Sequence, residues 1–296
     1  LKVGVFGVGH LGKFHLNNWK EIEGVKLVGF FDPNNDNAKS VMADYGLKRF
    51  MDEDKLIDAC DIIDVVVPTD WHHEVCMKAV RKGKHVFVEK PLALNLEELN
   101  TIIEAYSIST AKSTLTVGFN RRFSPHSIAV KNALGQSGPL NIVATMNAGF
   151  IPSNVWIHDL KIGGGRIIGE ACHYIDLASY LTDSKVVSVC MNSLGKHADE
   201  NTDNASIFLK YEDGSNVVIN YFSNGSKSYS KERIEVYNQE RTVIIDNFRK
   251  TEAFGFKNFK GLKTSIDKGH KSQFQELINK VKNSGDPLIE FDSIIN

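Results

Sequence analysis

Short apolar runs alternate with longer amphipathic segments over the first 118 residues of the chain. The predicted strands cover residues 3–7, 25–31, 62–67, 85–89 and 115–118. Most of these runs are apolar throughout, as is typical of strands covered on both faces. The predicted helices cover residues 10–19, 36–45, 71–82 and 95–107, the last beginning with a capping-box-like pair, Asn95 and Glu98. The alternation predicts a doubly wound parallel sheet with helices on both faces.

The pattern changes after residue 118. Helix-like segments near 126–136 and 170–181 are mixed with strand-like runs at 140–147, 185–192, 204–211, 215–222 and 233–246. Glu212-Asp213-Gly214 predicts a tight hairpin between two of these runs. Residues 254–269 show no clear period and are predicted to form a long loop, and residues 272–282 are predicted to form a final helix. We therefore expect an α/β domain over residues 1–118 and an α+β domain with a largely antiparallel open sheet over residues 119–296.

Composition and charge narrow the classes of partner. The chain has 296 residues, enough for two ordinary domains, and 35 basic against 36 acidic side chains. A formal charge of −1 gives no global field for nucleic acid or an anionic membrane. No apolar run approaches the roughly 18 residues of a membrane span. We expect neither partner, and we expect a second-domain sheet with one uncovered face to form a homodimer or homotetramer.

Cysteine usage and the chain ends bear on the compartment. The four cysteines lie far apart without a C-x-x-C spacing, which favours a reducing, cytoplasmic setting. The first predicted strand begins at once, so we expect no secretory segment. The chain starts at Leu1 without a Met and stops at Asn296, so we expect it to be trimmed at one or both ends.

A glycine motif follows the first predicted strand and opens the first predicted helix. Its sequence is Gly7-Val8-Gly9-His10-Leu11-Gly12. Gly7 would make the tight turn, Gly9 would let the backbone approach a pyrophosphate, and Gly12 would pack the helix closely on the strand. An ordinary strand-to-helix turn is the alternative.

Asp32 ends the second predicted strand, where a carboxylate accepts hydrogen bonds from the ribose of a bound dinucleotide. Pro33-Asn34-Asn35 follows, without an arginine for a 2′-phosphate, which favours NAD over NADP. A solvated acid or a helix cap is the alternative interpretation of Asp32.

A second motif, Glu89-Lys90-Pro91, follows the fourth predicted strand. Pro91 restricts the backbone of Lys90, and the end of a parallel strand is where open α/β folds bind ligands. Lys90 is thus a candidate catalytic residue. A surface lysine at a strand end is the alternative.

Four segments together resemble the glucose-fructose oxidoreductase and inositol dehydrogenase (Gfo/Idh/MocA) family. They are Val67-Pro68-Thr69-Asp70-Trp71-His72, Gly83 to Pro91, Gly163-Gly164-Gly165 and His173-Tyr174-Ile175-Asp176, in addition to the glycine motif. The resemblance implies an N-terminal Rossmann domain, a C-terminal domain that supplies the substrate pocket and often the subunit interface, and hydride transfer at a sugar or cyclitol carbon.

The resemblance also implies roles for single residues. Lys90 and His173 would flank the reacting hydroxyl, and Thr69 and His72 would lie near the nicotinamide half of the cofactor. The cofactor-binding candidates are Gly7, Gly9, His10, Leu11, Gly12, Asp32, Pro68, Thr69, His72, Glu89 and Lys90.

The second-domain motif departs from the family at one position. Relatives commonly place an aspartate four residues before the histidine, and here that residue is Gly169, followed by Glu170. On a helix Glu170, His173 and Asp176 would share one face. Either Glu170 replaces the missing acid as a catalytic residue, or Lys90 and His173 act without one.

Substrate-binding candidates come from the same half. The segments Gly118 to Pro125 and Gly165 to His173 resemble bacterial members associated with surface-polysaccharide or nucleotide-sugar pathways. Asn120, Arg121 and Arg122 would hold a phosphate or sugar hydroxyls, Trp156 and His158 would contact a sugar ring, and Asp176 would complete the set. The alternatives are solvated or domain-bridging arginines and a half-buried core tryptophan.

The expected chemistry is alcohol oxidation. The base must be neutral near working pH, and an imidazole, with an ordinary pKa of about 6.5, makes His173 the candidate. His72-His73-Glu74 and Cys172-His173 lack zinc-motif spacing, and no G-x-S-x-G elbow is present, so we expect neither a metal site nor a serine hydrolase. Two alternatives remain: an NAD-dependent glycosidase or epimerase that oxidises its sugar transiently, and a non-catalytic sensor of a dinucleotide or sugar.

Overall fold

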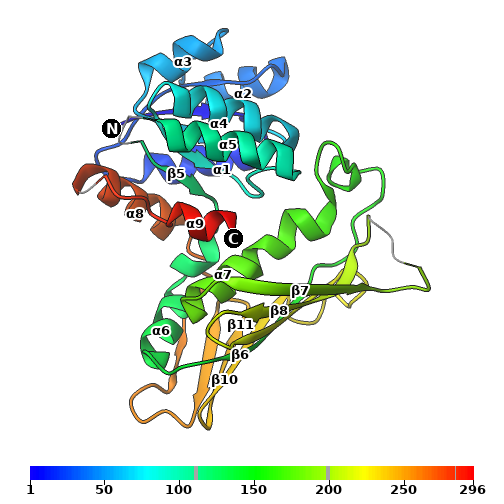
Figure 1. Cartoon of the computed structure of the whole chain (residues 1–296). Coiled ribbons are helices and arrows are strands. Elements are labelled where there is room, and N and C mark those ends of the chain that lie inside the picture. Colours follow the sequence, from blue (N-terminus) through cyan, green and yellow to red (C-terminus); the bar gives the residue numbers. More distant parts are fainter. Residues whose placement is uncertain (110–112, 198–200, 284) are drawn as a thin grey trace. The chain divides into compact units, whose positions relative to one another are not determined.

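The computed structural model describes residues 1–109, 113–197, 201–283 and 285–296. These residues form two compact units, one made of Leu1–Gly118 with Lys271–Ile295 and the other of Phe119–His270 with Asn296. Each unit contains one sheet (Figure 1). No helix among the described residues is long and apolar enough to cross a membrane.

The first unit is built on a five-stranded parallel sheet with the order β2-β1-β3-β4-β5. Its strands are β1 (Lys2–Phe6), β2 (Lys26–Phe31), β3 (Ile62–Val65), β4 (His85–Val88) and β5 (Leu115–Val117). An isolated parallel bridge joins Phe30 of β2 to Arg49. The segment around Arg49 therefore extends the β2 edge, which gives the strand order of a Rossmann fold and confirms the predicted doubly wound sheet.

Helices connect these strands. They are α1 (His10–Lys20), α2 (Asn35–Tyr45), α3 (Glu53–Ala59), α4 (His72–Arg81) and α5 (Leu96–Ile108), with the 3-10 turn η1 (Thr69–Trp71) before α4. The expected start of α5 is confirmed, because Asn95 accepts a hydrogen bond from the Glu98 amide at 2.9 Å. Helix α3, a short helix whose buried side chains are Leu56 and Ile57, was not predicted from the sequence.

The last part of the chain belongs to the first unit, which corrects the expectation that residues 119–296 form one domain. Helix α8 (His270–Asn283) and the short α9 (Phe291–Ile295) follow the second sheet in sequence. Phe274 of α8 packs against Trp19 and Phe87 at ring distances of 4.3 and 4.9 Å, and Gln273 donates to the carbonyl of Val117 at 2.9 Å. Burial of this apolar face against the parallel sheet is the physical reason for the return of the chain.

The second unit contains an eight-stranded sheet with the order β13-β12-β11-β10-β6-β9-β8-β7. Among its described residues, β6 and β9 pair in parallel and the other neighbouring strands pair antiparallel. Its strands are β6 (Asn141–Asn147), β7 (Val186–Ser193), β8 (Asn204–Tyr211), β9 (Asn216–Phe222), β10 (Glu232–Asn238), β11 (Arg241–Asp246), β12 (Lys250–Phe254) and β13 (Gly261–Lys263). The predicted, largely antiparallel sheet and the turn at Glu212-Asp213-Gly214 are confirmed.

Two expectations for this sheet are wrong. The expected single run 233–246 is a hairpin, because Gln239 and Glu240 take positive φ angles of 48° and 61° and turn the chain. The expected loop 254–269 contains β13, which pairs with β12.

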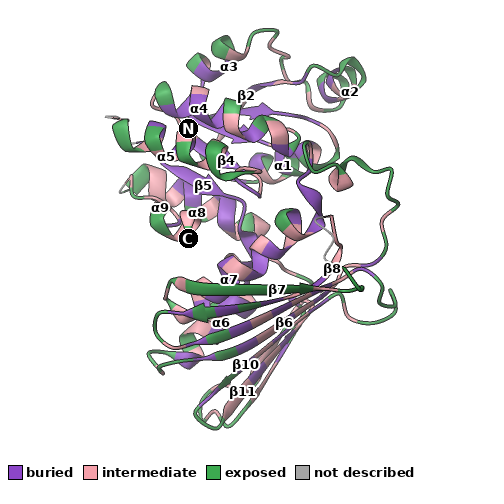
Figure 2. Cartoon of the chain, turned by 45° about the vertical axis from the view of Figure 1, so that its right-hand side comes forward, coloured by how far each residue is buried: buried purple, intermediate pink, exposed green. Residues whose placement is uncertain are grey.

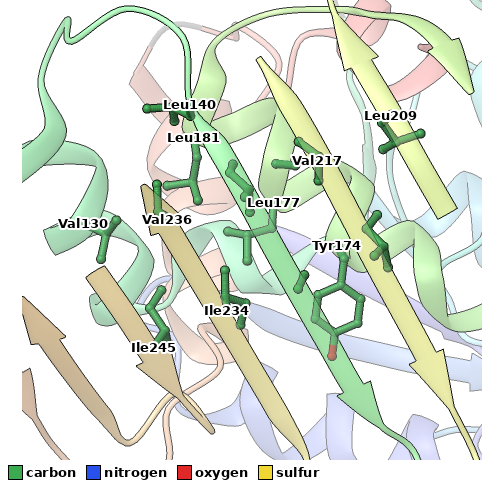
Figure 3. Close-up of a cluster of buried hydrophobic side chains, with 14 of the residues drawn as sticks. Val130, Leu140, Tyr174, Leu177, Leu181, Leu209, Val217, Ile234, Val236 and Ile245 are labelled. Atoms are coloured by element: carbon green, nitrogen blue, oxygen red, sulfur yellow. The ribbon is translucent and has the colours of Figure 1, made fainter. Parts of the chain in front are cut away.

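One face of this sheet is covered by helices α6 (Pro125–Leu134) and α7 (Cys172–Thr182). Figure 3 shows side chains of both helices, among them Val130, Leu177 and Leu181, packed on the strands. Along each strand, every second side chain points to this covered face, and the alternate side chains point to the opposite face. Those on the opposite face are only partly buried (Figure 2). The sheet thus fixes α7, and with it His173, on its covered face.

Candidate active site

The glycine motif makes a turn that only glycine fits at two of its positions. Gly7 follows β1 with a φ of +86°, and a Cβ there would lie 2.6 Å from the carbonyl oxygen of Val66 after β3. A Cβ on Gly12 would lie 2.1 Å from the carbonyl oxygen of Gly7. Gly7 therefore sits between β1 and β3, where the strand order reverses and α/β sheets bind ligands.

The start of α1 is suited to an anion. Gly9 is the N-cap, no side chain caps the helix, and its first turn carries no acidic residue. A Cβ on Gly9 would meet only the Nδ2 atom of Asn37, at 3.8 Å, so space remains beside the Gly9 backbone. His10 and Leu11 are exposed on the first turn. These features are compatible with a pyrophosphate at this turn, whose binding here stays a prediction.

Asp32 fixes the shape of this turn. It is buried, its Oδ2 accepts a hydrogen bond from the Val8 amide at 2.8 Å, and its Oδ1 accepts one from the Asn34 amide at 2.8 Å. Carboxylate oxygens have further lone pairs for ribose hydroxyls. The predicted cofactor acid therefore also holds the glycine turn against the end of β2.

An arginine lies close to this carboxylate, which the sequence analysis missed. Arg49 donates through Nη2 to the carbonyl oxygen of Asp32 and through Nη1 to Oδ1 of Asn35, both at 2.8 Å. Its guanidinium is thus engaged by the β2–α2 turn itself. The signal in the sequence was weak, because Arg49 comes 17 residues after Asp32.

Lys90 follows β4 at the same edge of the sheet and is half-buried, and its bond to Pro91 is cis. The ring of His72 lies between two backbone segments, with Nδ1 2.7 Å from the carbonyl oxygen of Pro91 and Nε2 3.0 Å from that of Val67. His72 is buried, and burial lowers its pKa. Thr69 is buried and Pro68 is exposed in the turn between β3 and α4. His72 therefore ties the segment after β3 to the segment that carries Lys90.

In the second unit, His173 lies in the first turn of α7 and is buried, with its ring 6.5 Å from that of Phe119. A π-helical turn, Ile167–Ala171, precedes α7 and contains Glu170. Its i→i+5 hydrogen bonding breaks the three-residue spacing on which we based a single face for Glu170, His173 and Asp176. A Cβ on Gly169 would have only an ordinary contact, 3.9 Å from the carbonyl oxygen of Gly163, so the backbone does not require glycine at this position.

Asp176 and Arg122 form a buried ion pair. The Nη2 and Nε atoms of Arg122 lie 2.5 and 3.0 Å from the two carboxylate oxygens. Burial raises the pKa of Asp176, and Arg122 opposes that shift. This pairing joins two predicted substrate-binding side chains to each other, and their contact with substrate stays a prediction.

Arg121 is engaged in the same way. Its Nε and Nη2 atoms lie 2.8 and 3.2 Å from the two oxygens of Glu232, which also accepts from Lys268. Burial raises the pKa of Glu232, but Arg121 and Lys268 outweigh it and lower the pKa to about 2. The side chain of Asn120 donates to the Lys268 carbonyl at 2.7 Å. These residues hold the second unit together, which was neither expected nor readable from the sequence.

Trp156 and His158 belong to a short 3-10 turn, Trp156–His158. Trp156 is 51% exposed, so it is not a core residue. The carbonyl of His158 accepts a hydrogen bond from Asn201 at 2.6 Å. A Cβ on Gly163 would lie 2.6 Å from the Cα of Ile157, so the glycine run lets this turn pack closely.

Within residues 1–109, 113–197, 201–283 and 285–296, no group of three or more His, Cys, Asp or Glu side chains is arranged to hold a metal ion.

Comparison with known proteins assigns both units. Residues 1–119 match the family model described as an oxidoreductase family with an NAD-binding Rossmann fold, and residues 131–244 match the GFO/IDH/MocA C-terminal domain. A myo-inositol 2-dehydrogenase of Thermotoga maritima is 28% identical over 97% of this chain and 90% of its own length. A UDP-N-acetylglucosamine 3-dehydrogenase of Acidithiobacillus ferrooxidans is 28% identical over 85% of this chain and 75% of its own.

The architecture agrees with a solved structure. The crystal structure of a probable dehydrogenase from Thermotoga maritima superimposes with a TM-score of 0.80 at 26% identity, covering 99% of this chain and 92% of the other.

Proposed function

Because the chain belongs to the GFO/IDH/MocA family of NAD-binding oxidoreductases, we propose that it transfers a hydride between NAD and a hydroxyl-bearing carbon of a sugar, cyclitol or nucleotide-sugar. The relatives named above act on myo-inositol and on UDP-N-acetylglucosamine, which sets the range of substrates. We assign proton transfer to Lys90 and His173.

One observation carries the proposal. The glycine turn after β1 and Lys90 after β4 lie at the same edge of one parallel sheet, with only β3 between the two strands. Two strand spacings of roughly 4.8 Å place the strand ends about 10 Å apart. This supports a dinucleotide whose pyrophosphate rests on α1 and whose nicotinamide reaches Lys90.

The chemistry divides between cofactor and protein. NAD, when bound, would supply the hydride acceptor for the alcohol carbon. The half-buried Lys90 orients the hydroxyl, and the buried His173 receives its proton. Glu170, three residues before His173, is the candidate acid. Its charge raises the pKa of Lys231 and so opposes the effect of burial, which lowers that pKa. Trp156 and His158 are the remaining candidates for sugar contacts.

A substrate panel tests the proposed reaction. Purified protein is mixed with NAD+ and, in turn, with myo-inositol, scyllo-inositol, glucose 6-phosphate and UDP-N-acetylglucosamine. We expect the absorbance of reduced nicotinamide to grow with at least one of them. Tight NAD binding without turnover would favour the sensor, and glycoside cleavage or epimerisation without net NADH would favour the non-redox alternative.

The role of Lys90 is tested by Lys90→Met. This change removes the ammonium group and keeps most of the length of the side chain. We expect kcat to fall by about 10³-fold or more, with less than about a threefold change in the Kd for NAD+. A variant with weak NAD+ binding and a normal residual rate would contradict the assignment.

We also propose that the uncovered face of the second sheet joins two copies of this chain. A cross-strand row on this face runs Phe208, Val218, Val143, Glu235, Ile244. Four of these five side chains are apolar, and Phe208 is 45% exposed. A second copy placed on this face would remove them from water.

A further inference from the structure

A buried cluster of charged side chains precedes Lys90 in the first unit. His15 comes from α1, Asp64 from β3 and Glu89 from the end of β4. The Nδ1 atom of His15 lies 3.1 Å from both carboxylate oxygens of Asp64, and its Nε2 atom lies 3.0 Å from Oε1 of Glu89. The side chains of His15 and Asp64 are 1% and 0% exposed. One imidazole therefore joins the helix that begins at the glycine motif to the residue before Lys90.

The contacts of His15 favour the imidazolium form of its ring. Both of its nitrogens face carboxylates, which only accept, so both must donate. Burial lowers the pKa of His15, but Asp64 and Glu89 outweigh it and raise the pKa to about 10. Three uncharged rings also contact His15 edge-on, those of Phe14, Phe87 and Phe274, at centroid distances of 6.2, 5.8 and 5.2 Å.

The carboxylates of Asp64 and Glu89 each accept a further hydrogen bond. Asp64 also accepts a hydrogen bond from Nε1 of Trp19 at 2.7 Å, which holds it in place. The Oε2 atom of Glu89 accepts one from the backbone amide of Lys90 at 3.3 Å. A Cβ on Gly118 would lie 3.0 Å from Oε1 of Glu89, so this glycine leaves room for the carboxylate. The charge of His15 thus holds the group to which the Lys90 backbone is bonded.

From this geometry we infer that His15 is a positioning residue for Lys90. Its imidazolium holds the Glu89 carboxylate in the position where it accepts a hydrogen bond from the Lys90 amide. It also offsets one of the two negative charges of Asp64 and Glu89. The inference rests on the proposed function, because it gives His15 a role through Lys90. Without the imidazolium, the uncompensated carboxylates of Asp64 and Glu89 would favour the ammonium form of Lys90 and raise its pKa. Without the charge of Glu89, the ammonium form would be less favoured and the pKa of Lys90 would fall.

The opposite signs of these effects define the experiment. Protein labelled with ¹³C at the lysine Cε is saturated with NAD+, and the titration of Lys90 is followed by NMR, its signal being assigned by its loss in Lys90→Met. His15→Gln should move the midpoint of Lys90 to higher pH, and Glu89→Gln should move it to lower pH. His85→Gln is the matched control, since His85 lies at the start of β4, where its ring contacts Thr114. It should leave the midpoint unchanged.

The outcomes separate positioning from a structural role. Lost packing alone would lower thermal stability in both variants without opposite shifts of Lys90. An unchanged midpoint in a folded His15→Gln variant, or shifts of the same sign in both variants, would overturn the inference. If His15→Gln does not fold, an unchanged midpoint in Glu89→Gln, whose side chain is 13% exposed, overturns it.

Turnover measurements keep the two proposals apart. With a substrate from the panel, His15→Gln should lower kcat by about tenfold or more with little change in the Kd for NAD+. Turnover retained in Lys90→Met would refute the catalytic role of Lys90 and leave the titration result standing. Turnover lost in Lys90→Met but intact in His15→Gln would refute the positioning role alone.

Discussion

Gly9→Ala separates folding from cofactor binding. The three glycines of the motif are alike in sequence, but only Gly9 has a negative φ, −65°, together with open space around its Cβ position. The nearest atom, Nδ2 of Asn37 at 3.8 Å, is an ordinary contact. An alanine at this position therefore fits the protein without strain.

The expected changes in stability and affinity differ in size. Alanine restricts the unfolded chain, which adds about 0.4–1 kcal/mol of stability, and it is a poorer N-cap than glycine by a similar amount. The free energy of unfolding should stay within about 1 kcal/mol of the parent. A pyrophosphate hydrogen-bonded at this turn would meet the new methyl group, and loss of one bond to a charged group costs about 1.5–3 kcal/mol. The Kd for NAD+ should rise by roughly 10- to 150-fold.

Titration calorimetry with NAD+ and urea unfolding measure the two quantities. Gly12→Ala is the contrasting variant, because its Cβ would lie 2.1 Å from the Gly7 carbonyl oxygen and the backbone must move. That variant should lose both stability and affinity. A stable Gly9→Ala protein that binds NAD+ with the parental Kd would refute the placement of the pyrophosphate on this turn.

Two further predictions concern the second unit. Because the pKa of Glu232 in the folded state, about 2, lies below its ordinary 4.5, its ion pairs with Arg121 and Lys268 stabilise the fold fully above pH 4.5. This contribution of about 3 kcal/mol to the free energy of unfolding should be lost as the pH falls from 4.5 towards 2. The Glu232→Gln variant should not show this loss. Plots of unfolding free energy against pH that run parallel for the two proteins would contradict the prediction. Phe208→Lys, on the uncovered face of the sheet, should dissociate the proposed oligomer in light scattering after gel filtration. An unchanged mass would exclude this face as the interface.

Local rules were sufficient where the physical cause is local. The glycine turn, the Asn95–Glu98 helix start and the turn at Glu212-Asp213-Gly214 were each predicted, since a few neighbouring residues fix them. The hairpin between β10 and β11 was missed because its turn residues, Gln239 and Glu240, are not the glycine or asparagine that such positive φ angles favour.

Burial decided the elements that the sequence concealed. Helix α3 is seven residues long and buries two side chains, so its pattern is too short for a reliable period. Strand β13 has three residues and is defined by its pairing with β12. Helix α8 was predicted, but its amphipathic pattern is the same whichever unit it covers, and only packing against Trp19 and Phe87 assigns it to the first.

The sequence by itself determined the two-domain architecture, the dinucleotide motif and the identity of Lys90 and His173 as candidates, because each follows from short-range pattern or from resemblance to a family. Only the tertiary structure decided the partners of the charged residues. Arg121 pairs with Glu232, which is 111 positions away in the sequence, and His15 pairs with Glu89, which is 74 positions away. The partner of a charged residue cannot be read from the neighbouring sequence. Folding brings together charged side chains from distant segments, and a charge that is buried needs a partner because it loses its contact with water.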